Sequence, residues 1–375
     1  MRFIFYSPIS FEDWNWTNSI EKGIGGSETS HVEMAWRLAK RGHEVITYAP
    51  IPKDSPNEWR NTKWYRIEKA DFKQEGIWIL YRCPHIVNKF PPISKRINQK
   101  LWLLMQDWDY DWTNKEIKNT DLIITLCKSH GRDVVSKHPL IKKYNNLWLT
   151  SNGVKIDLVE KIEKERIKRN PKKIVHTSSP DRGLRYCLRS FKKAREYVPD
   201  LEFHAYYGFN NLSKMTKADP NGWLADIQRE TEELMKMSGF TFHGRITQEE
   251  LYREWFSAGI WIYETDFNET SCISSMEAQC MGAIPIYSPK YALGENVGHG
   301  VAIEGDASDP LTQSRFGAEL MKMALMPDLQ EKIRVEMMSW ARKRFDWEQM
   351  VQQWIAKAEG RQYDKEFPVQ LVYET

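Results

Sequence analysis

The sequence lacks the cysteine patterns that mark disulfide frameworks and zinc sites. Its five cysteines are odd in number, and no two stand in a CxxC spacing, which suits a reducing compartment. Long apolar runs are also missing. No stretch approaches the roughly 18 apolar residues of a membrane span, and the first apolar run is too short for a signal peptide. We therefore expect a cytoplasmic protein without a transmembrane segment.

An excess of charge of either sign is absent as well. The 54 basic residues nearly balance the 51 acidic ones, leaving a formal net charge of +3, so no electrostatic footprint for nucleic acid is present. The densest basic run, residues 161–173, is interrupted by acids, and we interpret it as a solvated helix and linker. Nucleic acid is not an expected partner, and the oligomeric state stays open.

A chain of 375 residues is long for a single core, which makes two domains the default expectation. Tryptophan is abundant, with 16 copies. The tryptophans could fill a generous core, or they could line a surface that faces a carbohydrate or a partner, and both interpretations are open at this point.

Short apolar segments alternate with helical patterns, which predicts parallel sheets covered by helices. Ser27 is predicted to cap a helix that Gly42 ends, and a second helix is predicted over 129–137. The strands predicted in the first half are 2–6, 45–48, 77–81, 101–105, 122–126 and 147–149.

The pattern restarts after a polar stretch at 151–172, so the expected fold class is α/β with two doubly wound parallel-sheet domains. The boundaries are 1–155 and 156–345, with the terminal segment 346–375 packing back on the first domain. The strands predicted in the second half are 174–177, 203–207, 260–263 and 284–287. Its predicted helices are 184–197, a capping-box helix from Thr247 to Ser257, one near 275–281, and 347–358.

The most informative motif follows the predicted strand 260–263, where a polar loop leads into a helix near Ser274. Loops after parallel strands lie at the ligand edge of a sheet, and a helix N-terminus suits a diphosphate. Small polar residues at 270–272 would let phosphate approach their amides. Glu269 and Glu277 could accept hydrogen bonds from paired hydroxyls, as on a sugar and a ribose.

The spacing Glu269-x7-Glu277, followed by Ala278, Gly282 and Pro285, resembles the signature of family 4 of the retaining glycosyltransferases. Such enzymes have the GT-B fold, in which two Rossmann-like domains face a central cleft. The resemblance implies that Glu269 contacts the donor sugar and Glu277 holds the nucleotide ribose. It also implies that the amides of the segment between them hold phosphate, namely those of Thr270, Ser271, Cys272 and Ile273.

The glycine-rich turn at 23–29 resembles the GG-x-E turn in the first domain of the same family. Glycines at a helix start let backbone approach a ligand. The resemblance implies that Gly25 and Gly26 face the donor diphosphate and the transferred sugar. Glu28 could serve the acceptor side or cap the helix.

The segment 178–184 occupies the place of the family's GR…KG pattern. Arg182 matches the lysine, while Ser178 and Ser179 stand where the first arginine is expected. One cation is therefore missing. Charge on the diphosphate would be met by Arg182, serine hydroxyls including that of Ser179, and helix amides.

The string 106–111 reads QDWDYD. Relatives show His-Asp near this point, and Gln106 replaces a histidine that could take a proton. Asp107, Asp109 and Asp111 form two DxD patterns, which a hard divalent cation would accept. An acceptor-side or positioning role, a surface loop and a metal site are all open, and we favour the first, with no metal.

Two weaker segments complete the resemblance. Residues 151–154 (SNGV) resemble the family's domain crossing, and Gly244 and Arg245 lie where relatives line the base pocket. Together the motifs predict a metal-independent hexosyltransferase without a separate cofactor. It would transfer sugar from a UDP- or GDP-sugar to a glycan, lipid or other hydroxyl acceptor. A nucleotide-sugar-binding protein without turnover, or an epimerase of the same fold, remains the alternative.

Overall fold

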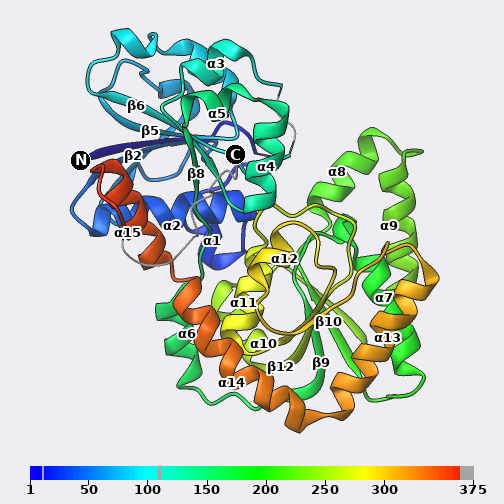
Figure 1. Ribbon diagram of the computed structural model, residues 1–375. Helices are drawn as coiled ribbons and strands as arrows, with labels where there is room; N and C mark the ends of the chain where they lie inside the picture. The colour runs from blue at the N-terminus through cyan, green and yellow to red at the C-terminus, as the bar shows by residue number, and fades with distance from the viewer. Residues whose placement is uncertain (11, 109–110, 364–375) are drawn as a thin grey trace. The chain divides into compact units, whose positions relative to one another are not determined.

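The computed structural model describes residues 1–10, 12–108 and 111–363, and the chain divides into two compact units (Figure 1). Unit 1 contains residues 1–19, 24–153 and the segment from Asp346 onward, and unit 2 contains residues 20–23 and 154–345. Each unit has its own sheet with helices packed on it. Within the described ranges, no helix combines the length and apolar character needed to cross a bilayer.

The sheet of unit 1 has the order β3-β4-β2-β1-β5-β6-β7-β8. All neighbouring strands run parallel except β3 and β4. The expectation of a purely parallel sheet is therefore wrong at this edge. Arg60 and Asn61 both have positive φ and form the two-residue turn that joins antiparallel strands. The strands are β1 (Arg2–Tyr6), β2 (Glu44–Ala49), β3 (Glu58–Trp59), β4 (Thr62–Arg66), β5 (Gly76–Tyr81), β6 (Gln99–Leu104), β7 (Leu122–Thr125) and β8 (Leu147–Leu149).

The longest helix of the N-terminal half is α2 (Gly26–Lys40), and its N-cap is Gly25. The prediction of Ser27 as the cap is wrong, because the carbonyl of Gly25 already accepts the amide of Thr29. The other helices of this half are α1 (Asn18–Glu21), α3 (Asn114–Lys118), α4 (Lys128–Lys137) and α5 (Leu140–Tyr144), with short 3-10 turns η1 (Ile67–Lys69), η2 (Pro84–Lys89) and η3 (Ile93–Lys95).

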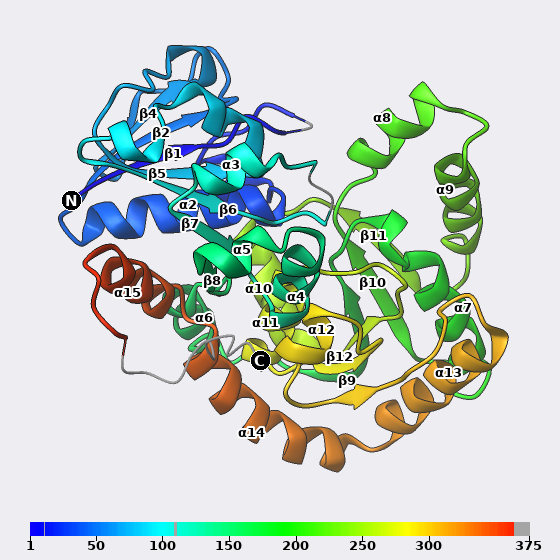
Figure 2. The ribbon, with the colours of Figure 1, turned by 45° about the horizontal axis from the view of Figure 1, so that its top comes forward.

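The sheet of unit 2 has the order β11-β10-β9-β12-β13-β14, and all its neighbouring strands are parallel, as predicted. Figure 2 shows α7 and α13 side by side over this sheet. The strands are β9 (Asn170–His176), β10 (Glu202–Tyr206), β11 (Phe240–Gly244), β12 (Ala258–Tyr263), β13 (Ile284–Tyr287) and β14 (Val301–Ala302). The helices are α6 (Ile156–Glu163), η4 (Pro180–Arg182), α7 (Leu184–Arg195), α8 (Asn210–Ala218), α9 (Trp223–Leu234), α10 (Gln248–Ser257), α11 (Ile273–Met281), α12 (Ala292–Asn296), α13 (Pro310–Leu325) and α14 (Pro327–Arg344).

The basic run 161–173 is only partly the solvated helix and linker that its composition indicates. Its start belongs to α6, but β9 already begins at Asn170. Lys173 is buried, and its ammonium donates to Glu254. A lysine can lie along a strand in this way because its stem is apolar and its charge has found a carboxylate.

Most tryptophans lie in the two cores, which favours the first of the two interpretations of their number. Eleven of them are buried, and the most exposed tryptophan is Trp223 on α9. A satellite cluster in unit 1 joins Trp14, Trp36 and Trp64. The buried set is Trp14, Trp16, Trp36, Trp64, Trp78, Trp102, Trp112, Trp255, Trp261, Trp347 and Trp354.

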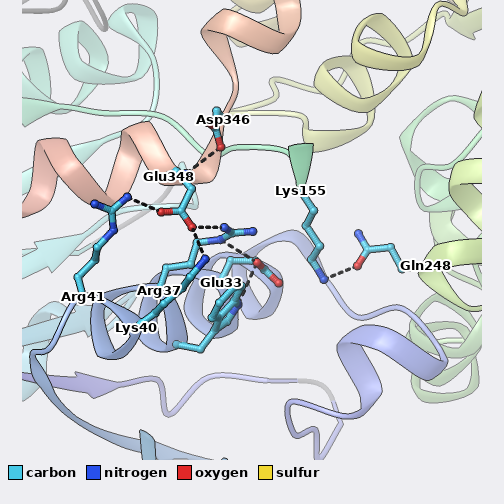
Figure 3. Close-up of polar contacts among 9 residues, drawn as sticks. Glu33, Arg37, Lys40, Arg41, Lys155, Gln248, Asp346 and Glu348 are labelled. Carbon is cyan, nitrogen blue, oxygen red and sulfur yellow. Dashed lines mark hydrogen bonds and ion pairs between the residues drawn. The ribbon is translucent and has the colours of Figure 1, made fainter. Parts of the chain in front are cut away.

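A buried ion pair holds α15 (Trp347–Ala358) on α2 (Figure 3). Arg37 is 2% exposed, and its guanidinium contacts Glu33 at 3.2 Å and Glu348 at 2.5 Å. Arg41 donates to the same Glu348 at 2.7 Å. The arginine therefore joins a carboxylate of its own helix to one that the C-terminal segment brings.

We expect Arg37→Met to lower the free energy of unfolding by about 3–5 kcal/mol, because the buried carboxylate of Glu33 loses its cation. Urea denaturation measures the loss. The control is Arg2→Met, which breaks the exposed pair with Glu44 and should cost no more than about 1 kcal/mol. Equal losses in the two variants would show that burial adds nothing to the Arg37 pairs.

Candidate functional site

Each sheet contains one point where the strand order reverses, and loops leave the sheet in opposite directions there. In unit 2 this point lies between β9 and β12, and in unit 1 it lies between β1 and β5. Ligands of open parallel sheets bind outside the carboxyl ends of the strands at such points. The residues that follow these four strands are therefore the first place to look for a site in each unit.

In unit 2 the loops after β9 and β12 touch at Gly183. This glycine has φ +116°, and a Cβ atom there would lie 2.2 Å from the carbonyl oxygen of Glu264. Only glycine allows both the backbone angle and the close approach. The η4 turn that carries Arg182 is thereby held directly against the polar loop that carries Glu269.

Arg182 and Glu269, both predicted site residues, form an ion pair at this point. Nη1 of Arg182 lies 3.2 Å and 3.4 Å from the two carboxylate oxygens of Glu269. Tyr263 donates its hydroxyl to Glu269 at 2.6 Å, and the guanidinium lies 4.2 Å from the ring centre of Phe267. Arg182 is 38% exposed while Glu269 is only 8% exposed. The cation of the pair is therefore accessible to solvent, whereas the carboxylate is buried.

Arg182 keeps its positive charge at neutral pH. Burial acts to lower its pKa, but the combined electrostatic effect of Glu269, Tyr263, Asp181 and Tyr207 outweighs burial and raises the pKa above the ordinary value. Sequence reasoning missed Tyr263 and Phe267, which hold this pair. The sequence indicated them only by position, because Tyr263 ends the predicted strand 260–263 and Phe267 lies in the polar loop that follows.

The loop then enters α11 without a side-chain cap. Cys272 is the N-cap residue and has φ +61°, and its side chain forms no capping hydrogen bond. The Ser271 hydroxyl is buried and has no hydrogen-bond partner among the described residues, while its carbonyl accepts from Asn296 at 2.6 Å. Thr270 is buried as well, and Ile273 is the first helical residue. An uncapped helix start with a buried hydroxyl beside it suits an anion.

The serine hydroxyls that follow β9 are used in the local structure. Ser179 donates to Asp181 within η4. Thr177 donates to Ser274 at 2.7 Å and so ties the end of β9 to the first turn of α11. The Ser179 hydroxyl is thus engaged within the protein, and its predicted role toward a diphosphate stays a prediction.

Glu277 lies on α11 one turn beyond Ile273 and is only 6% exposed. Burial raises its pKa to about 7, although neighbouring polar side chains and the charge of Lys155 act in the opposite direction. Gln248 of α10 is one of these neighbours, with its amide nitrogen 3.5 Å from a carboxylate oxygen. Glu277 therefore changes charge near neutral pH.

Two further buried titratable groups lie at the same point and were given no role from the sequence. Burial lowers the pKa of His176, the last residue of β9, to about 3, so its imidazole is neutral. Burial raises the pKa of Glu264 to about 8, and Ser190 donates to it at 2.5 Å. Both groups are uncharged at neutral pH and leave Arg182 and Glu269 as the charged pair.

Gly244 and Arg245 end β11, in the same unit. Gly244 has φ +67°, which is the reason for a glycine there, since nothing lies within 4 Å of where a Cβ would be. Its carbonyl accepts the amide of Tyr207, a residue with the strained φ of +116°. The Arg245 guanidinium lies 5.3 Å from the ring centre of Tyr207. An aromatic face and a cation thus meet at the ends of β10 and β11, and the base-pocket role stays a prediction.

In unit 1 the loop after β1 leads to Gly25 and Gly26, and the strand β5 is followed by Arg82. A Cβ on Gly25 would lie 2.2 Å from the Glu28 carboxylate, which therefore folds over the first turn of α2. Burial raises the pKa of Glu28, and the charge of Arg82 acts against that rise. Arg82 lies 3.4 Å from Glu28 and 3.6 Å from Asp107. Arg82 was missed because no motif surrounds it.

The string 106–111 can be placed only in part. Gln106 is buried, Asp107 is half-exposed beside Arg82, and Asp111 is exposed. The prediction for Asp109 lies outside the described residues. Over the described part of the chain, no group of three or more histidine, cysteine or acidic side chains is placed to hold a metal ion. All five cysteines fall in that part, are buried and form no disulfide with one another.

Comparison with solved structures identifies the fold. A glycosyltransferase from Rickettsia africae is 14% identical with a TM-score of 0.68, and the match covers 96% of this chain and 98% of that one. A sucrose-phosphate synthase from Thermosynechococcus elongatus is 12% identical with the same score and coverages. Anabaena HepE in complex with UDP-glucose is 11% identical with a TM-score of 0.69, covering 96% and 100%. No protein-family model and no curated protein sequence matches the chain. The chain has the α/β GT-B fold.

The raised pKa of Glu277 makes a prediction about stability. Between about pH 4.5 and pH 7 the folded protein holds a proton on Glu277 that the unfolded chain has released. The contribution of this group to stability therefore falls as pH rises through that window. We expect Glu277→Gln to increase the free energy of unfolding, by about 2 kcal/mol more at pH 8 than at pH 5.

Urea denaturation at the two pH values checks this expectation. Glu160→Gln, which changes an exposed carboxyl on α6, is the matched control and should show no such pH dependence. A gain for Glu277→Gln that is the same at both pH values would mean that the buried carboxyl is already ionised at pH 5.

Proposed function

We propose that the protein is a retaining glycosyltransferase of the family 4 type, which moves a hexosyl group from a UDP- or GDP-sugar to a hydroxyl acceptor. The observation that carries the proposal is the Arg182–Glu269 pair at the β9/β12 reversal point. Glu269 lies in the loop that leads into the uncapped start of α11, and Glu277 follows on that helix. The GT-B fold, which many glycosyltransferases share, supports the proposal by analogy.

The chemical problem is the negative charge that develops on the departing nucleoside diphosphate. Arg182 remains charged, and the first turn of α11 carries the positive end of the helix dipole. A guanidinium and amides that are already in place need no reorganisation when the glycosidic bond breaks, which is how preorganised electrostatics lowers a barrier. This arrangement also compensates for the cation that the sequence lacks beside Ser179.

Glu269 is suited to hold the transferred sugar. Its carboxylate accepts hydrogen bonds from Tyr263 and Arg182. These bonds fix the directions in which its remaining acceptor positions can meet sugar hydroxyls. A carboxylate at this place also favours positive charge on the sugar ring. The acceptor hydroxyl would attack from the face that the diphosphate leaves, and its proton would pass to the departing phosphate oxygen. This path retains the anomeric configuration without an enzymic nucleophile.

Glu277 is proposed to accept hydrogen bonds from the ribose hydroxyls, which requires its ionised form. We assign the cluster of Glu28, Arg82 and Asp107 in unit 1 to the acceptor, because it lies at the other reversal point and carries two carboxylates around one guanidinium. In this proposal Gly25 and Gly26 bring backbone toward the donor, and Gln106 positions Asp107.

The donor can be tested directly. The solved structure of Anabaena HepE contains UDP-glucose, so UDP and its sugars come first, and GDP and ADP sugars follow. A nucleotide that binds the folded state raises the unfolding midpoint. We expect Glu277→Gln to weaken binding of the preferred nucleoside diphosphate by roughly 1.5–3 kcal/mol in calorimetric titration, because hydroxyl bonds to a charged acceptor are lost.

Arg182→Ala should reduce steady-state transfer by about a hundredfold or more, because the charge it meets grows in the transition state. The matched control is Arg189→Ala on α7, which loses a pair with Glu230 and should transfer at the wild-type rate. Unchanged affinity in Glu277→Gln together with unchanged turnover in Arg182→Ala would overturn the proposed site. Donor binding without transfer or hydrolysis would instead identify a binding protein.

Transfer should not need a divalent cation, since Arg182 and helix amides meet the phosphate charge. We expect the rate in excess EDTA to equal the rate with added Mg²⁺ or Mn²⁺. If chelation abolished activity and Mn²⁺ restored it, residues 107–111 would be a metal site, and Asp107→Asn would then be expected to raise the Mn²⁺ concentration needed.

A further inference from the structure

Lys155 is connected through the side chain of Gln248 to Glu277, the carboxylate that we propose binds the ribose. The chain enters unit 2 at Val154 and leaves it at Phe345, and the amide of Val154 donates to the carbonyl of Phe345 at 2.5 Å. Lys155 comes next and is 9% exposed. Its ammonium donates to the amide oxygen of Gln248, at the first position of α10 (Figure 3).

This contact fixes the orientation of the Gln248 amide. A lysine ammonium has three donors and no acceptor, so the amide must turn its oxygen toward Lys155. Its NH₂ group must then point the other way, and its nitrogen lies 3.5 Å from an oxygen of Glu277. A group that only donates can serve Glu277 best when that side chain is an ionised carboxylate, which only accepts. The lysine thus selects the amide orientation that suits the charged form.

In the part of the chain that the structure describes, the other causes that act on the pKa of Glu277 are polar side chains, with no second cation among them. Tyr252 and Trp255, also on α10, lie beside its carboxyl group and act to lower its pKa. The strand β13 and the helix α12 also pack against α11. Their titratable groups are Tyr287 on β13 and Glu295 on α12. Arg342 of α14 donates to the carbonyl of Cys280 and pairs with Glu163, and Arg334 lies beside Gly282, both toward the C-terminal end of α11.

We propose that Lys155 is a positioning residue for nucleotide binding, which acts through Gln248 to keep Glu277 ionised and oriented toward the ribose. The inference rests on the proposed function, because it takes Glu277 as the ribose acceptor. It adds a residue outside the loop and helix that carry the donor site. It also makes the segment through which the chain enters unit 2 part of the nucleotide-binding machinery.

The test is the pH dependence of binding, measured with UDP and GDP by calorimetric titration from pH 5.5 to pH 9. In the wild type, affinity should fall as pH drops through about 7, where Glu277 takes up a proton. Lys155→Met should weaken binding about five- to tenfold at pH 7, the size of one hydrogen-bond contribution. Its affinity should recover toward the wild-type value at pH 9, because the midpoint moves to higher pH.

Gln248→Met should move the midpoint in the same direction as Lys155→Met but by less, because the charge of Lys155 also acts on Glu277 directly. The double variant should be no worse than Lys155→Met alone, because both act on one connection. Lys155→Arg, which also only donates, should restore the wild-type midpoint. The matched control is Lys161→Met, which breaks an exposed pair between the same two helices, α6 and α10, and should leave the profile unchanged. Glu277→Gln gives the pH dependence that comes from the diphosphate itself.

The outcomes separate this inference from the proposed function. If the wild type binds neither UDP nor GDP nor any other nucleoside diphosphate, the proposed function fails and the inference fails with it. If the wild type binds and Lys155→Met shows the wild-type midpoint, the inference alone is overturned. A uniform loss of affinity in Lys155→Met at every pH would also overturn it, since a merely structural residue acts in that way.

Discussion

The approach of Gly183 to the backbone of Glu264 is the constraint on which the arrangement of unit 2 depends. Parallel strands in a doubly wound sheet send their loops away from the reversal point, and the loops after β9 and β12 would diverge without a contact between them. A residue without Cβ lets the two backbones meet. Arg182 then lies beside Glu269, and the start of α11 lies where the loop ends. The guanidinium–carboxylate geometry follows from a steric requirement a few residues away.

The two acids of the signature are held in different ways by the same short segment. Glu269 keeps a cation within 3.2 Å and a phenol within 2.6 Å, so its negative charge is compensated. Glu277, eight residues later on α11, is buried beside neutral side chains and the charge of Lys155, and its pKa is about 7. Two carboxyl groups that lie in different environments often have different tasks. Here one carboxylate is paired with a cation, and the charge of the other depends on its neighbours.

The sequence predicts much of the fold because buried parallel strands are short apolar runs that need no partner to be recognised. The strands at 2–6, 147–149 and 284–287 and the helix at 347–358 have the predicted bounds. The strand at 62–66 was missed because it lies near an edge and only two of its five residues are buried. The helices at 210–234 were missed because few of their residues face a core.

The candidate site divides in the same manner. Residues carried by a motif, such as Arg182 and Glu269, could be paired in advance, because the motif order implies the loop order. Arg82 could not be found, since it follows β5 with no pattern around it and reaches Glu28 only through the strand order. The burial of Glu277 and its link to Lys155 depend on how α10 packs, which no spacing in the sequence encodes. The roles of the site residues stay predictions.

The route of the chain has a consequence for its synthesis. Arg37 and Glu348 are 311 residues apart, yet they share one buried contact in unit 1. A ribosome adding about 5–20 residues per second needs roughly 15–60 s to cover that distance. Nearly all of unit 2 comes from one uninterrupted stretch, so it can complete its fold first. During that interval the arginine of the nascent α2 lacks its partner Glu348, and the N-terminal unit, although made first, is the last to be finished.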